Sequence, residues 1–313
     1  FFGLFSVFLN QFPNLQNIGS TYRESMKNFS TSAPLFSRNL SLNLGGTIMD
    51  LSTPRVMGII NATPDSFYDG SRVPDAIHAV EKAREMVQQG ADILDVGAVS
   101  TRPGSQEISE SEELERLSPV LEALRGEFPD FPLSVDTWRA GVARVVCDRF
   151  GIQMINDISA GKLYPDMFST MAKLGIPYII MHMQGSPVNM QDAPEYENIV
   201  DDLLQFFAQK VYQLRKQGLN DIVIDPGFGF GKTLEQNYTL LGQFDAFRML
   251  ELPLMAGISR KSMIYKLLES EPEQALNGTT AAHMAVLIKG ARLLRVHDVQ
   301  AAVETVKIFQ QIY

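Results

Sequence analysis

Eight short runs of apolar, often β-branched residues alternate with amphipathic stretches from Arg55 to the end of the 313-residue chain. The runs are VMGIIN (56–61), DILDVG (92–97), PLSVDT (132–137), QMINDI (153–158), YIIMHM (178–183), DIVIDPG (221–227), PLMAGIS (253–259) and ARLLRVHD (291–298). Near-continuous apolar strands separated by helices are typical of a parallel sheet that helices cover. Eight strand–helix repeats over residues 55–313 match a (β/α)8 TIM barrel, which typically has about 250 residues. We therefore predict an α/β fold of this kind.

An open doubly wound sheet is the alternative architecture. It usually has fewer strands and a glycine-rich first turn, whereas the first turn here reads NATPDSF (61–67). The stretch that follows, DAIHAVEKAREMVQQ, predicts a helix with Ala76, Ile77, Val80, Ala83 and Val87 on its buried face.

The segment ahead of the barrel divides into two parts. SLNLGGTIMDL (41–51) predicts a short hairpin with Gly45 and Gly46 at its turn, placed to plug the bottom of the barrel. We expect residues 1–38 to be a disordered leader and residues 39–313 to be a single catalytic domain. The leader has few acidic residues, so it is either a transit peptide or translated sequence ahead of a start at Met26.

Composition excludes several classes of partner. The net charge of −9 argues against a nucleic-acid surface, which needs a basic face. The apolar run at residues 1–9 is far shorter than the roughly 20 residues of a membrane span, so we expect a soluble protein without a membrane partner. A single cysteine, Cys147, cannot form an intrachain disulfide and favours a reducing compartment such as the cytoplasm.

Polar residues end each apolar run, and in TIM barrels the carboxyl ends of the strands carry the active site. These residues are Asn61, Asp95, Asp136, Asn156, Asp157, His182, Asp225, Ser259, Arg260, Lys261, Arg295 and His297. Burying one such group without a partner costs roughly 1 to 3 kcal/mol, so a ring of them implies a polar ligand. The carboxylates and the amide suit a flat heterocycle with adjacent N–H donors. Arg102, Lys261, Arg295 and His297 suit a multiply charged anion, and a ring bearing phosphate satisfies both sets.

Three other chemistries fit the sequence poorly. PGFGFGKT (226–233) resembles a phosphate-binding P-loop but has Pro226 where that motif needs glycine. The four histidines lie too far apart for a helical zinc pair. The chain also lacks the Gly-x-Ser-x-Gly elbow of serine hydrolases.

Eight motifs in order resemble those of the dihydropteroate synthase family, over about residues 47–310. They are NATPDSF (61–67), STRPG (100–104), SVDT (134–137), IND (155–157), MHMQG (181–185), DPGFGFGK (225–232), SRKS (259–262) and RVHD (295–298). This chain departs from the family at Val99, where many members carry an acid, and at Ser71, where glycine is common.

The resemblance implies transfer of a 7,8-dihydropterin-6-ylmethyl group from its diphosphate to 4-aminobenzoate, with Mg²⁺ as the cofactor and a homodimer as the assembly. It assigns Asn61 to the diphosphate and its metal, and Thr101, Arg102, Arg295 and His297 to the departing diphosphate. It assigns Asp136, Asn156, Asp225 and Lys261 to the pterin, Pro103, Phe230 and Ser262 to 4-aminobenzoate, and Met183 to substrate binding in general.

Two other functions on the same barrel stay open. A methyltransferase acting on methyltetrahydrofolate would keep Asp136, Asn156 and Asp225 for the ring but would not need Asn61, Arg295 or the STRP motif. A non-catalytic pterin-binding module would keep the ring of polar residues at the strand ends but would not catalyse a reaction.

Overall fold

The structure, a computed structural model, describes residues 40–62, 73–99, 108–185 and 194–313. Residues 40–313 make one compact unit. The expected leader at residues 1–38 lies outside the described residues, and so do Thr101, Arg102 and Pro103.

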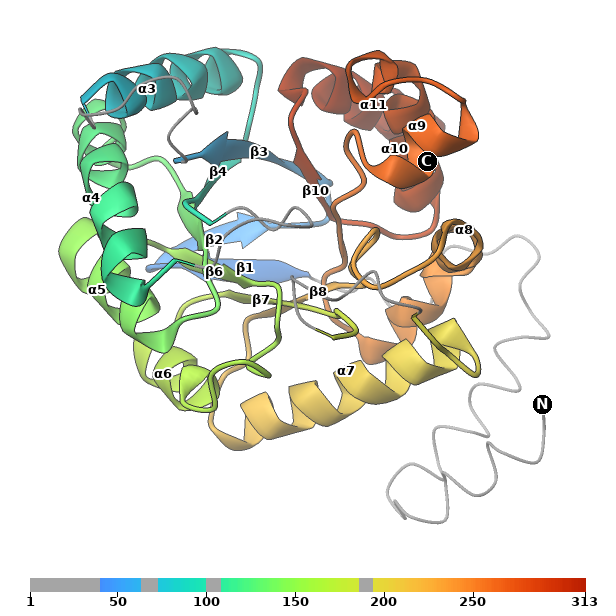
Figure 1. Cartoon of the computed structure of the whole chain (residues 1–313), viewed down its shortest axis with the longest axis horizontal. Coiled ribbons are helices and arrows are strands. Elements are labelled where there is room, and N and C mark those ends of the chain that lie inside the picture. Colours follow the sequence, from blue (N-terminus) through green and yellow to red (C-terminus); the bar gives the residue numbers. More distant parts are fainter. Residues whose placement is uncertain (1–39, 63–72, 100–107, 186–193) are drawn as a thin grey trace. The chain divides into compact units, whose positions relative to one another are not determined.

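Eight parallel strands form a ring, as the sequence predicts (Figure 1). The strands are β3 (Arg55–Asn61), β4 (Ile93–Gly97), β5 (Leu133–Asp136), β6 (Met154–Asp157), β7 (Tyr178–Met181), β8 (Ile222–Asp225), β9 (Met255–Ala256) and β10 (Leu293–Val296). Their order is β8-β7-β6-β5-β4-β3-β10-β9. A parallel bridge between Ile224 and Leu254 brings β8 next to β9, so the barrel is nearly closed and the open-sheet alternative is wrong.

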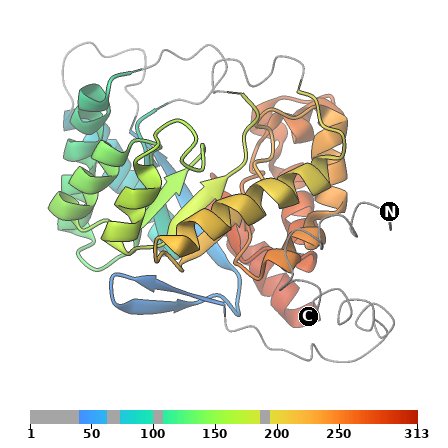
Figure 2. The same cartoon turned by 90° about the horizontal axis from the view of Figure 1, so that it is seen from below.

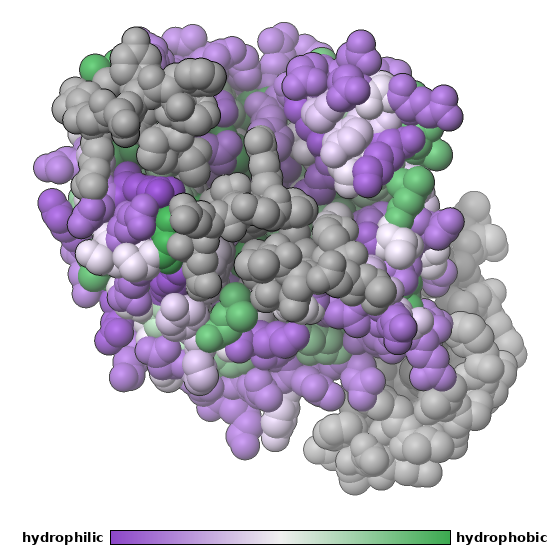
Figure 3. All heavy atoms as spheres, in the orientation of Figure 1, coloured by the Kyte–Doolittle hydropathy of each residue, from purple (hydrophilic) through white to green (hydrophobic). Residues whose placement is uncertain are grey.

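Helices follow the strands and cover the outside of the ring. They are α3 (Val73–Gln88), α4 (Glu110–Glu127), α5 (Ala140–Phe150), α6 (Met167–Leu174), α7 (Ile199–Lys216), α8 (Leu234–Gly242), α9 (Ser262–Leu267), α10 (Leu276–Ile288) and α11 (Val299–Ile312), with short 3₁₀ turns at Phe244–Leu250 and Pro272–Gln274. Figure 3 shows polar side chains over most of the described helical surface on one face. No helix in the described ranges combines the length and the apolar character that a bilayer span requires.

Four of the five residues predicted on the buried face of α3 pack against the core, and the fifth, Ile77, does not. Ala79, Ala83 and Met86 are its buried residues, whereas Ile77 is 55% exposed. Positions 79, 83 and 86 follow the four- and three-residue spacing of one helix face, and position 77 lies off that face. The prediction for Ile77 was therefore wrong, although the helix itself is confirmed.

The N-terminal hairpin closes one end of the barrel, as the sequence predicts. Strands β1 (Ser41–Leu44) and β2 (Thr47–Asp50) pair antiparallel, and Gly45 and Gly46 form the turn with φ of +61° and +101°. Positive φ at both turn residues matches the twist of a hairpin and favours glycine. The hairpin packs beneath the strands (Figure 2), where its leucines join the apolar bottom layer of the barrel interior. That layer comprises Leu42, Leu44, Leu51, Met57, Ile93, Met154, Ile179, Val223, Met255 and Leu293.

Candidate functional site

A polar layer lies directly above this apolar layer inside the barrel. Side chains two residues apart on a strand point to the same face of a sheet. Counting two residues on from Ile93, Met154, Val223 and Leu293 therefore gives the next inward-facing residues, which are Asp95, Asn156, Asp225 and Arg295. The strands thus place these four side chains toward the mouth of the barrel, above the apolar layer. We call this polar layer, together with the residues beside it at the mouth, the cup.

Strand register brings further predicted residues into one row. Asn61 pairs with Gly97, Gly97 with Asp136, and Asp136 with Asn156, across four neighbouring strands. Asn61 is exposed at the end of β3, while Asn156 is buried. The row therefore runs from the open rim at Asn61 into the cup at Asn156.

Arg295 links the carboxylates of this layer. Its Nε donates to Asp95 Oδ2 at 2.6 Å, and its Nη2 donates to Asp136 Oδ2 at 2.8 Å. Asn156 Nδ2 donates to the same Asp95 oxygen at 3.0 Å. Asp95 Oδ1 is buried and accepts no hydrogen bond from the described residues, so it is an available acceptor within the cup. Burial raises the pKa of Asp136 to about 7, although the Arg295 cation acts in the opposite direction.

Asp225 and Lys261 form the second charged part of the cup. Both flank Gly257, where a Cβ would lie 3.7 Å from Asp225 Oδ2 and 3.8 Å from Lys261 Nζ. Asp225 Oδ1 accepts from the Gly227 amide at 2.8 Å, and Lys261 Nζ donates to the Phe228 carbonyl. Burial raises the pKa of Asp225 and lowers that of Lys261 to about 8, and the charge of each opposes the shift of the other.

An apolar cluster lines one side of the mouth. Trp138, Ile158, Met181 and Met183 form it, and Val99, Tyr164 and Phe230 pack against it. Lys261 Nζ lies 4.4 Å from the centre of the Phe230 ring, a cation–π distance that joins the apolar and charged parts. Ser262, half-buried, begins α9 directly after Lys261.

Three of the polar residues that end the strands turn away from the cup, and the prediction that they join the ring was wrong. Asp157 accepts from Tyr178 and from two loop amides, His182 packs edge-on against Phe206 of α7, and Arg260 pairs with Asp298. Asp157 follows the inward-facing Asn156, so alternation along the strand turns it outward.

Two residues that sequence reasoning passed over support the site. Lys232, which the rejected P-loop motif contains, is buried, and its Nζ donates to the carbonyls of Gly227 (2.8 Å), Phe230 (3.0 Å) and His182 (3.3 Å). It therefore holds the loop after β8 instead of a phosphate. Gly257 is the second, and its inward position could have been found by counting two residues on from Met255.

A separate groove of about 380 Å³ lies outside the barrel. Its lining residues are Lys82, Glu85, Met86, Gln89, Leu276, His297, Asp298, Gln300, Ala301 and Glu304. Only His297 among them belongs to the predicted site residues, so this groove is distinct from the polar cup.

Comparison with known proteins agrees with this geometry. Residues 57–297 match the family model described as pterin binding enzyme. The dihydropteroate synthase of Escherichia coli K12 is 42% identical over 267 residues, covering 85% of this chain and 94% of that protein. That of Haemophilus influenzae is 41% identical, covering 87% of this chain and 98% of the relative.

Solved structures give the same result. The Yersinia pestis dihydropteroate synthase in complex with a sulfonamide drug superposes with a TM-score of 0.81 at 42% identity, covering 87% of this chain and 99% of that one. The Xanthomonas albilineans enzyme in complex with 7,8-dihydropteroate superposes with a TM-score of 0.76 at 34% identity, covering 87% and 98%. This chain therefore belongs to the dihydropteroate synthase family of pterin-binding enzymes.

Proposed function

We propose that this chain is a transferase that moves a 7,8-dihydropterin-6-ylmethyl group from diphosphate to the amine of 4-aminobenzoate, forming dihydropteroate in folate biosynthesis. The observation that carries the proposal is the buried polar layer of Asp95, Asp136, Asn156, Asp225 and Arg295, with Lys261 beside it. Such a layer has to be matched by a ligand with both donors and acceptors, as a reduced pterin has.

We assign the pterin ring to this layer. The Asp225 carboxylate suits the adjacent N–H groups of the ring, while Lys261 and the Asn156 amide suit its acceptor atoms. Asp136 and Met183 complete the pocket, since Asp136 pairs with Arg295 and Met183 belongs to the apolar cluster at the mouth.

We assign the diphosphate to the rim. Arg295 and His297 stand on or just after β10, and Asn61 ends the neighbouring strand β3. Mg²⁺ takes oxygen ligands and usually keeps water and substrate phosphate oxygens, so few protein ligands are needed. The exposed Asn61 amide suits that role, and when bound the ion would neutralise charge on the diphosphate. Thr101 and Arg102 remain predictions for the same group.

The reaction then needs no protein nucleophile. The C–O bond to diphosphate breaks, the C–N bond to 4-aminobenzoate forms, and the amine loses a proton. Arg295 and His297 stabilise the charge that develops on the leaving group. Phe230 and Ser262, with Pro103 as a further prediction, hold 4-aminobenzoate against the apolar cluster, which keeps water from the reacting carbon.

We further propose a homodimer that acts in a reducing compartment such as the cytoplasm. Cys147 is the chain's one cysteine, so it cannot form an intrachain disulfide, and burial raises the pKa of its thiol to about 12, which favours the protonated form. Exposed isoleucines on α10 and α11 offer an apolar contact for a second copy.

One incubation tests the reaction. The purified chain is mixed with the pterin diphosphate, 4-aminobenzoate and Mg²⁺, and dihydropteroate and diphosphate are measured by chromatography. Equal amounts of both products are expected. Pterin binding without any product would instead indicate a non-catalytic binding module. A separate incubation with methyltetrahydrofolate and a corrinoid protein would show methyl transfer if the chain were the methyltransferase.

A further inference from the structure

The side of the barrel between β9 and β10 has little backbone pairing near the mouth. Strand β9 has only two residues, and its register with β10 ends at Ala256 and Leu294. The site residues Lys261 and Arg295 both lie beyond that point. Because the ladder stops short, side chains have to hold these two segments together.

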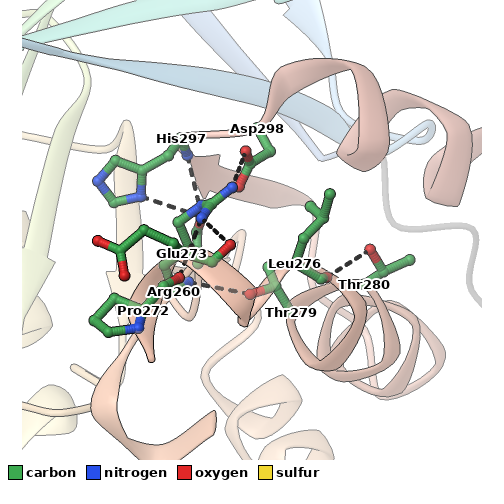
Figure 4. Close-up of polar contacts among 9 residues, drawn as sticks. Arg260, Pro272, Glu273, Leu276, Thr279, Thr280, His297 and Asp298 are labelled. Carbon is green, nitrogen blue, oxygen red and sulfur yellow. Dashed lines mark hydrogen bonds and ion pairs between the residues drawn. The ribbon is translucent and has the colours of Figure 1, made fainter. Parts of the chain in front are cut away.

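Arg260 and Asp298 make the principal contact there (Figure 4). Arg260 Nε donates to Asp298 Oδ2 and Nη2 donates to Oδ1, both at 2.8 Å. The two parallel hydrogen bonds fix the relative orientation of the groups as well as their distance. Arg260 Nη1 also donates to the carbonyls of Pro272 (3.1 Å) and Glu273 (2.9 Å), so all three guanidinium nitrogens donate hydrogen bonds.

The backbone of Arg260 is unusual for a residue with a side chain. Its φ is +53°, in the left-handed region that favours glycine. A non-glycine residue adopts this conformation at an energetic cost, so it persists only where surrounding contacts enforce it. The Arg260 amide donates to Thr279 Oγ1 at 3.1 Å, so α10 enforces the turn together with Asp298.

This turn lies between Ser259, which contacts the site residue His297, and the site residue Lys261. Ser259 precedes it, and its Oγ lies 3.2 Å from His297 Nδ1 and accepts from the His297 amide at 3.2 Å. Lys261 follows it and faces Asp225 across Gly257. Asp298 directly follows His297 in the chain, so each half of the ion pair is next in sequence to a residue of the proposed site.

We propose that the Arg260–Asp298 ion pair is a positioning clamp that sets Lys261 for the pterin and His297 for the diphosphate at the same time. This inference rests on the proposed function, since it takes the substrate assignment of those two residues from it. Neither Arg260 nor Asp298 needs to touch substrate. If the clamp is broken, affinity should fall at both the pterin and the diphosphate subsites. Removing a residue that contacts substrate should lower affinity mainly at one of them.

The test uses Arg260→Ala, Asp298→Asn and the double variant in the full chain. Affinity is measured separately for inorganic diphosphate with Mg²⁺ and for the 6-hydroxymethyl dihydropterin, which lacks diphosphate. Each single variant should weaken both by about 5- to 50-fold, which is about 1 to 2.3 kcal/mol. The double variant should lose little more than either single one, because both remove the same contact.

Arg84→Ala is the matched control. Arg84 of α3 also makes two guanidinium hydrogen bonds to a carboxylate, because its Nε and Nη2 both donate to Glu127 Oε1 of α4, at 3.0 and 2.7 Å. The Arg84→Ala variant should leave both affinities within twofold of the wild-type values. The clamp is refuted if the Arg260 and Asp298 variants also stay within twofold, match the control, or lose affinity at one subsite only. Wild-type turnover measured alongside reports on the proposed function independently of these affinities.

Discussion

The charge balance of the Asp95 and Asp136 carboxylates depends on a single arginine. Arg295 is the only cation within salt-bridge distance of Asp95 and Asp136 among the described residues. Two carboxylates brought together in a buried site oppose each other's ionisation, and a shared guanidinium relieves that repulsion. The arginine therefore balances the two carboxylates and is placed to pair with an anionic leaving group.

The first residue-scale prediction concerns Asp225. Asp225→Ala removes the acceptor for the N–H groups of the pterin, so affinity for a pterin should fall by about 2 to 5 kcal/mol, roughly 30- to 3,000-fold. Titration calorimetry with the 6-hydroxymethyl dihydropterin measures this. Asp92→Ala is the control, because Asp92 bonds Arg55 at the other end of the strands and should leave affinity unchanged. Equal affinity in wild type and Asp225→Ala would refute the assignment.

The charge of Lys261 should make the activity depend on pH. Burial lowers its pKa to about 8, so the amine holds its proton below that pH and loses its charge above it. We expect kcat/KM for the pterin diphosphate to fall as pH rises through about 8. Lys261→Arg should move this fall upward by more than one pH unit, because arginine stays charged. An unchanged alkaline limb in that variant would show that another group titrates.

At the scale of elements, the hairpin acts as a plug for the barrel bottom. Leu42 is buried in the apolar layer, whereas Ile48 on the same hairpin is 64% exposed. Leu42→Ala should therefore destabilise the fold by about 2 to 4 kcal/mol, and Ile48→Ala by less than about 0.5 kcal/mol. Urea unfolding followed by circular dichroism measures both. Similar midpoints for the two variants would contradict the plug.

The strands and the hairpin could be predicted because each depends on local information. An uninterrupted apolar run identifies a strand covered on both faces, and the paired glycines identify the turn. Asp95, Asn156, Asp225 and Arg295 were found by the same logic, since they directly follow apolar residues on parallel strands whose carboxyl ends meet at one mouth.

The direction of individual side chains was harder to predict. Arg260 and Asp157 stand beside true members of the cup, but a turn with positive φ directs the first to Asp298 and strand alternation directs the second to Tyr178. The role of Lys232 was hidden because its partners are backbone carbonyls, which any sequence supplies. Ile77 was misplaced because it is apolar and adjoins Ala76, although the next residue along a helix points away from the face that its neighbour occupies.

At the scale of the whole molecule, the proposed dimer gives a direct prediction. Ile308 and Ile312 are 57% and 62% exposed and lie four residues apart on one face of α11. Replacing both with glutamate should shift the chain from dimer to monomer in sedimentation velocity. The control, Ile77→Glu, changes a comparably exposed isoleucine on α3 and should leave the dimer intact. A wild-type chain that sediments as a monomer would refute the assembly.

The barrel works as two stacked layers, with an apolar floor that supports a charged cup open at one end. A crystal structure of the chain with 7,8-dihydropteroate would test this arrangement most directly. We predict the pterin ring within hydrogen-bonding distance of Asp225 and Asn156, with the benzoate portion reaching past Phe230 toward Ser262. A product molecule seated instead in the outer groove between α3 and α11, with the polar layer empty, would contradict the account.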